Sequence, residues 1–254
     1  MNSKTVITAF VGKGGVGKTS LSALTVRLLS ERYPDKRILA IDADPAIGLS
    51  TALGIEPAST VDDIRKLFVT TAQSGETNTA IELLAEAKYR MLDTLVEYGN
   101  ISFLAIGRPE SSGCYCKVNA YLKEIISMLS DSFDYVVIDG EAGIEQVNRR
   151  VMEKVTHLIL VSDASRKGLQ VVKTIHDVAR ELVMFKRAGV IINRIPQSVS
   201  LTKEDTDGIE ILSTIAYDIE MSLSDINGGS VFELNSSSLI YKGAENALKK
   251  LEMI

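Results

Sequence analysis

Short apolar runs alternate with helix-like segments along the chain. The first predicted strand is Thr5–Val11, and leucines at helical spacing then continue to Pro34. Further strands are predicted at Arg37–Asp42, Ile101–Ile106, Tyr135–Asp139, His157–Val161, Ala188–Asn193 and Glu210–Ile215, and further helices at Thr60–Phe68, Thr79–Tyr98, Val118–Leu129, Leu169–Phe185 and Gly243–Ile254. Strands separated by helices of this length need parallel crossovers. We therefore expect one α/β domain over residues 1–254, a mostly parallel twisted sheet with helices on both faces.

The composition is that of an ordinary globular chain. Of 254 residues, 45% are hydrophobic and 24% charged, so a core can form without disulfides or structural metals. The net charge of −5 argues against a nucleic-acid partner, which usually selects a basic surface. No apolar run approaches the roughly 18–20 residues that span a bilayer. We expect a cytoplasmic protein without a membrane partner.

The strongest chemical signal is the segment Gly12–Thr19, which joins the first strand to the first helix. It matches G-x-x-x-x-G-K-[ST] in the strand–loop–helix context of a phosphate loop, so the fold is predicted to be a P-loop NTPase. Glycines let backbone N–H groups surround an anion, and the helix N-terminus adds partial positive charge. A glycine-rich turn without a ligand is the alternative. The expected ATP-binding residues are Gly12, Lys13, Gly14, Gly15, Val16, Gly17, Lys18, Thr19 and Ser20, with Lys18 on the β- and γ-phosphates and the Thr19 hydroxyl on Mg²⁺.

Acidic residues follow two of the predicted strands. Asp42 and Asp44 come at the end of one, and Asp139 ends another. Ligands of open parallel sheets bind outside the carboxyl ends of the strands. Asp139 has the position of a Walker B aspartate, which holds Mg²⁺ through water. A helix cap or turn is the alternative role for each aspartate.

The two cysteines, Cys114 and Cys116, form a Cys-x-Cys pair. In an extended chain their side chains point to one side, about 6.5–7 Å apart at Cα, which suits one shared metal better than a disulfide. Thiolates are soft ligands suited to zinc, nickel, copper(I) or iron. Two thiolates leave a tetrahedral site incomplete, whereas two pairs on a dimer axis supply four sulfurs. Two free thiols without a ligand are the alternative.

The phosphate loop resembles the deviant Walker A motif of the MinD/ParA/nitrogenase-iron-protein class because Lys13 precedes Gly14 and Gly15. The resemblance implies ATP hydrolysis in a nucleotide-sandwich homodimer, where Lys13 reaches the partner's phosphates. It also implies that Asp44 positions the attacking water, with Asp42 in support, and that Asp139–Glu145 is a second switch segment. Asn193 would read the adenine edge, although a turn-forming asparagine remains open.

Three segments together resemble the CooC family of nickel-insertion ATPases. They are Gly-Lys-Gly-Gly-Val-Gly-Lys-Thr, Gly-Arg-Pro-x4-Cys-x-Cys and Asp-Gly-Glu-Ala-Gly-Ile-Glu. The resemblance implies a homodimer that binds Ni²⁺ or Zn²⁺ through Cys114 and Cys116 and serves carbon-monoxide dehydrogenase or acetyl-CoA synthase. Two alternatives remain: an iron-protein-like electron donor, for which the second switch segment lacks a cysteine, and a MinD/ParA-like spatial organiser.

Overall fold

The computed structural model describes residues 5–73, 86–87, 89–107, 116–140 and 155–254. Its strands form an eight-stranded sheet in the order β3-β4-β2-β5-β1-β6-β7-β8. Every neighbouring pair is parallel except β3 with β4. The strands are β1 (Val6–Gly12), β2 (Ile38–Asp42), β3 (Val96–Tyr98), β4 (Ile101–Ala105), β5 (Tyr135–Asp139), β6 (His157–Ser162), β7 (Arg187–Ile195) and β8 (Ile211–Ala216).

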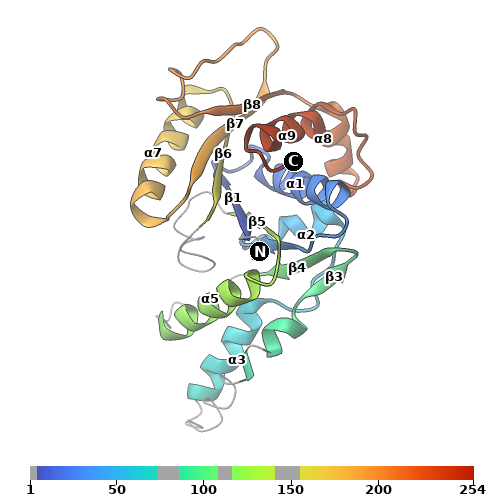
Figure 1. Cartoon of the computed structure of the whole chain (residues 1–254), viewed down its shortest axis with the longest axis vertical. Helices are drawn as coiled ribbons and strands as arrows, with labels where there is room; N and C mark the ends of the chain where they lie inside the picture. Colours follow the sequence, from blue (N-terminus) through green and yellow to red (C-terminus); the bar gives the residue numbers. More distant parts are fainter. Residues whose placement is uncertain (1–4, 74–85, 88, 108–115, 141–154) are drawn as a thin grey trace.

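Helices cover both faces of this sheet (Figure 1). One core packs α3, α5 and α7 against alternate strand residues such as Ala9 and Leu160, and the other packs α1, α2 and α9 against intervening residues such as Phe10 and Ile159. The helices are α1 (Lys18–Arg32), α2 (Gly48–Leu53), α3 (Val61–Gln73), α5 (Cys116–Ser130), α7 (Arg166–Leu182), α8 (Ile219–Ile226) and α9 (Leu239–Lys250). The predicted fold class is confirmed.

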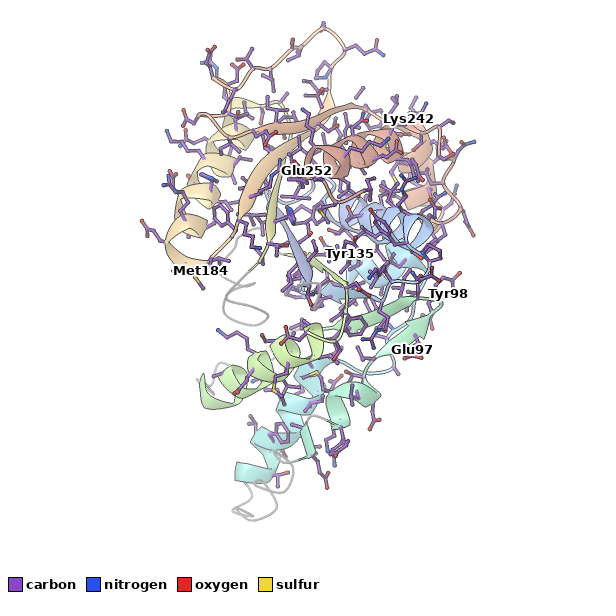
Figure 2. All side chains as sticks on the ribbon, viewed as in Figure 1. Glu97, Tyr98, Tyr135, Met184, Lys242 and Glu252 are labelled. Carbon is purple, nitrogen blue, oxygen red and sulfur yellow. The ribbon has the colours of Figure 1, made fainter. Side chains whose placement is uncertain are left out.

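The predicted helix Thr79–Tyr98 is wrong at its carboxyl end. Val96–Tyr98 is instead the edge strand β3, which pairs antiparallel with β4. Gly99, with φ of 59°, makes the turn between them, and Tyr98 lies at that edge of the molecule (Figure 2). A helical pattern in sequence cannot detect this hairpin, because the partner strand supplies the hydrogen bonds that Val96–Tyr98 would otherwise make within a helix.

The sequence patterns did not predict two short helices, α2 and α8. Helix α2 begins after Ile47, which has φ of 51°, and ends at Gly54. Helix α8 begins at Asp218, whose side chain accepts a hydrogen bond from the Met221 N–H. Helices of six and eight residues are too short to show a clear apolar period. Among the described helices, none combines the length and apolar character needed to cross a membrane.

Candidate nucleotide-binding site

The phosphate loop joins β1 to α1 in the middle of the sheet, and two of its glycines are sterically required. A Cβ on Gly12 would run into the carbonyl oxygen of Val161 on the neighbouring strand β6. Gly17 has φ of 93°, and a Cβ there would come within 2.6 Å of Asn193 Nδ2. Positive φ and close approach both favour glycine. The loop can therefore bend sharply into α1 and leave its N–H groups free for an anion.

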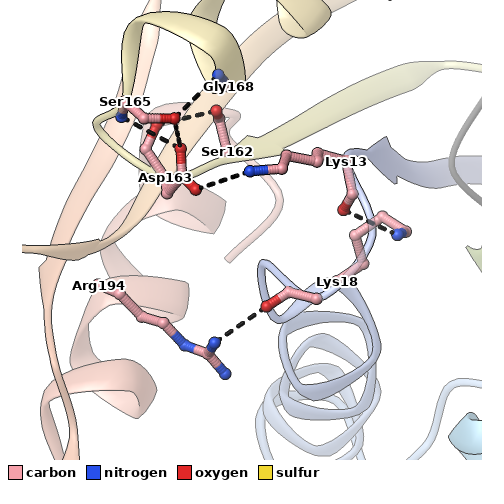
Figure 3. A network of polar contacts seen from close by, with 8 residues as sticks. Lys13, Lys18, Ser162, Asp163, Ser165, Gly168 and Arg194 are labelled. Carbon is pink, nitrogen blue, oxygen red and sulfur yellow. Dashed lines mark hydrogen bonds and ion pairs between the residues drawn. The ribbon is translucent and has the colours of Figure 1, made fainter.

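The two lysines of the loop point to different partners (Figure 3). Lys18 is only 7% exposed, and its ammonium donates to the Lys13 carbonyl oxygen at 3.2 Å. The Lys13 ammonium instead forms an ion pair with Asp163 Oδ2 at 3.2 Å. Lys18 thus lies inside the loop, whereas Lys13 leaves it toward the end of β6.

Asp42 and Asp139 are fully buried and adjacent in the register of β2 and β5. Both oxygens of Asp42 accept backbone hydrogen bonds, from Asp44 N at 3.1 Å and from Leu49 N at 2.8 Å. Asp139 Oδ1 accepts from the Ser22 hydroxyl at 3.0 Å, but the buried Oδ2 has no hydrogen-bond partner. A buried carboxylate oxygen without a partner is costly unless a cation or water satisfies it.

The surroundings of these two carboxyls raise both pKa values. Burial and the charge of Asp139 raise the pKa of Asp42 to about 7. Burial raises the pKa of Asp139 to about 6, although the nearby Thr19 and Ser22 hydroxyls and the charge of Lys18 oppose the change. The chemistry of this pair therefore fits a divalent cation, whose charge would favour both ionised forms.

Asp44 begins the connection from β2 to α2. Its Oδ1 accepts from Ala46 N at 2.9 Å, which shapes the turn, and the side chain is not fully buried. Asp42 fixes the start of this segment through the Asp44 N–H and its far end through the Leu49 N–H. Asp42 thus contacts the backbone of Asp44, and its support of a catalytic Asp44 stays a prediction.

Asn193, at the end of β7, is buried against the phosphate loop. Its Nδ2 donates to the Val16 carbonyl oxygen at 2.9 Å, and its Oδ1 accepts from Arg194 N at 3.0 Å. Arg194 has φ of 57° and donates from Nη1 to the Gly15 carbonyl oxygen at 2.9 Å. These two residues support the loop from β7, which is separated from β1 by β6. Adenine recognition by Asn193 stays a prediction.

Sequence reasoning missed Ser22, Asp163 and Arg194. Ser22 lies one helical turn after Lys18 and faces Asp139, which a spacing argument could have found. Asp163 follows β6 and Arg194 lies near the end of β7, and only the strand order brings them beside the loop. The position of Asp163 at a strand end was the available signal.

The Cys-x-Cys prediction concerns residues that the structure does not describe. Cys114 lies outside the described residues, and Cys116 begins α5 without a described side chain. Within the described ranges, no cluster of three or more histidine, cysteine, aspartate or glutamate side chains could hold a metal ion. Of the segment Asp139–Glu145, only Asp139 and Gly140 are described.

The CobQ/CobB/MinD/ParA nucleotide-binding domain matches residues 7–231. The chain belongs to this family of P-loop ATPases. An uncharacterized ATP-binding protein of Methanocaldococcus jannaschii is 35% identical, covering 97% of this chain and 98% of its own length. The carbon monoxide dehydrogenase accessory protein CooC of Rhodospirillum rubrum is 30% identical, covering 89% of each chain. MinD of Pyrococcus horikoshii, solved with Mg-ADP, shares this family fold with a TM-score of 0.69 at 20% identity, covering 98% and 96% of the chains.

Proposed function

We propose that this chain is a CooC-type ATPase that works as a homodimer and delivers nickel to a client enzyme. The observation that supports the nucleotide step is the phosphate loop, where buried Lys18 lies near the unpartnered oxygen of Asp139. A triphosphate brings negative charge for the lysine and loop N–H groups, and its cation satisfies the carboxylate. ATP with Mg²⁺ meets the needs of the lysine and of the carboxylate together.

The chain's own residues divide the work of hydrolysis. Lys18 and the loop N–H groups bind the β- and γ-phosphates. The Thr19 hydroxyl and, through water, Asp139 hold Mg²⁺, which neutralises phosphate charge when bound. Asp44 orients the attacking water, and Asp42 fixes the backbone that carries Asp44. Lys13 crosses to the phosphates of the facing chain, in the manner of an arginine finger.

Substitution of Lys18 tests the nucleotide step. We expect Lys18→Ala to weaken ATP binding by about 10- to 100-fold, because a charge-assisted contact to phosphate is lost. Isothermal titration calorimetry with Mg-ATP measures this loss. Lys36→Ala is the matched control, since Lys36 pairs with Asp134 just before the amino end of β5, whereas the phosphate loop follows the carboxyl end of β1. Equal affinities for the two variants would contradict the proposed loop chemistry.

The nickel role is supported by the relation to CooC and by the Cys-x-Cys pair. Nickel is the cargo in this proposal, held by Cys114 and Cys116 from both chains of the homodimer, and Zn²⁺ can occupy the same thiolates. Hydrolysis changes the dimer interface and with it the affinity for the metal. The client is a nickel enzyme such as carbon-monoxide dehydrogenase or acetyl-CoA synthase.

Metal titration of the purified protein tests this role. We expect the Cys114→Ala/Cys116→Ala variant to lose Ni²⁺ binding while it still hydrolyses ATP, which shows that the fold is intact. His176→Ala is the control, because a histidine that is not part of the proposed four-sulfur site should leave the Ni²⁺ stoichiometry of one per dimer unchanged. Unchanged Ni²⁺ binding in the cysteine variant would contradict the metal site. The alternative of a MinD/ParA-like organiser would then stand, since the family includes both kinds of protein.

A further inference from the structure

Lys13 is held within its own chain in this structure. Its ammonium lies 3.2 Å from Asp163 Oδ2, and the two side chains are 37% and 33% exposed. Figure 3 shows Lys13 extended from the phosphate loop toward Asp163 rather than curled over the loop. Among the described residues, the ammonium is therefore paired with a carboxylate beside the loop.

Asp163 is itself fixed in place. Its Oδ1 accepts hydrogen bonds from the backbone N–H and the hydroxyl of Ser165. The Ser165 hydroxyl in turn accepts from Gly168 N at 3.0 Å and caps α7. Partial burial opposes ionisation of Asp163, but the hydrogen bonds from Ser165 and Lys13 outweigh it and lower the pKa of this carboxyl. Asp163 therefore presents a fixed negative charge to Lys13.

This charge affects any anion that enters the loop. Lys13 follows Gly12 at the end of β1, and Asp163 follows the adjacent strand β6, so the pair lies at the rim of the phosphate site. Because Lys13 is already paired with a carboxylate, its electrostatic attraction for a nearby phosphate is weaker. The negative charge of Asp163 also repels the phosphate. Lys13 must leave Asp163 before it can contact phosphate at full strength.

We propose that Asp163 is an autoinhibitory latch that keeps Lys13 on its own chain until ATP-dependent pairing of two chains releases it. The latch rests on the proposed function, because it assumes that Lys13 acts on the triphosphate of a second copy. Release leaves the Ser165 contacts of Asp163 intact, so the start of α7 can stay folded while Lys13 changes partner. The latch therefore limits the pairing of two chains, and with it ATP hydrolysis, until both chains hold nucleotide.

The size of the effect follows from the exposure of the pair. An ion pair with both partners about one third exposed changes an equilibrium constant by a factor of about two to five. Two latches open when one dimer forms, so their factors multiply. Removal of the latch should tighten the dimer by about 4- to 25-fold.

Asp163→Asn removes the charge and keeps an oxygen that accepts from Ser165. The experiment measures the dimer dissociation constant by sedimentation equilibrium with Mg²⁺ and a non-hydrolysable ATP analogue. Asp134→Asn is the matched control, because Asp134 also pairs with a lysine and accepts a backbone N–H, but before the amino end of β5. Lys13→Ala and the Lys13→Ala/Asp163→Asn double variant complete the set, and thermal melting checks that each variant folds.

The latch predicts tighter dimers for Asp163→Asn, no change for Asp134→Asn, and no effect of Asp163→Asn when Lys13 is alanine. Unchanged or weaker dimerisation of Asp163→Asn overturns the latch, and a weaker dimer would mean that Asp163 positions Lys13 productively. Failure of the proposed function has a different signature. In that case the unsubstituted protein stays monomeric with the analogue, which overturns both proposals.

Discussion

Asp42 and Asp139 are two carboxyls that the fold places next to each other away from the solvent-exposed surface. They are neighbours across β2 and β5, both fully buried, and the pKa values rise to about 7 and about 6. The folded chain therefore binds protons on them that the unfolded chain, with ordinary aspartate pKa values, releases. Their contribution to stability is full below about pH 4 and is lost as pH rises through about 6 to 7.

We predict that this loss is visible in the protein without nucleotide or Mg²⁺. Between pH 5 and pH 8 the free energy of unfolding should fall by an amount on the order of 4 kcal/mol from this pair, and Mg²⁺ should stabilise the chain more at pH 8 than at pH 5.5. Urea unfolding across this pH range measures both effects. Asp42→Asn should flatten the pH dependence, whatever its effect on absolute stability. Parallel pH profiles for the two proteins would contradict the assignment.

At the scale of elements, the phosphate loop depends on what β7 places behind it. Gly17 has φ of 93° and faces Asn193, whose Nδ2 donates to the Val16 carbonyl oxygen. The loop, β7 and the start of α1 therefore form one packed unit. By contrast, a Cβ on Gly14 would meet no atom within 4 Å.

This contrast gives a matched pair of substitutions. Gly17→Ala should cost about 1–3 kcal/mol through positive φ and the contact with Asn193, which lowers the melting temperature by about 2–12 °C. It should also weaken Mg-ATP binding at least about tenfold, because the loop backbone must shift. Gly14→Ala should melt within about 2 °C of the unsubstituted protein. Calorimetric melting and ATP titration of both variants test the contrast, and similar melting temperatures would argue against a constrained loop.

At the scale of the whole molecule, the last helix belongs to the core. In α9, Ile240, Ala244 and Leu248 are at most 3% exposed and pack in the cluster that contains α1. Beyond it, Leu251 and Met253 are also buried. A membrane-binding tail needs an apolar helix face that is free to enter lipid, and α9 has already buried its own.

We therefore predict that the protein does not bind anionic liposomes in the presence of Mg-ATP. Co-sedimentation with vesicles that contain anionic lipid should recover only the background amount, and a membrane-binding MinD protein serves as the positive control. ATP-dependent recovery with the vesicles would instead favour a MinD-like organiser over the nickel role. This measurement separates a membrane-binding MinD-like organiser from the nickel role without reference to the cysteines.

The sequence by itself determined the α/β alternation, the phosphate loop at Gly12–Thr19 and the acidic ends of two strands. These features are local: buried strands need apolar runs, and a loop that wraps phosphate needs glycines followed by lysine at fixed spacing. Only the tertiary structure decided the edge strand Val96–Tyr98, because its hydrogen-bond partner is another strand. The strand order also decided that Asp163 lies beside Lys13 and Arg194 beside Gly15. Contacts between residues 150 or more positions apart depend on how strands pair, and no local pattern encodes that pairing.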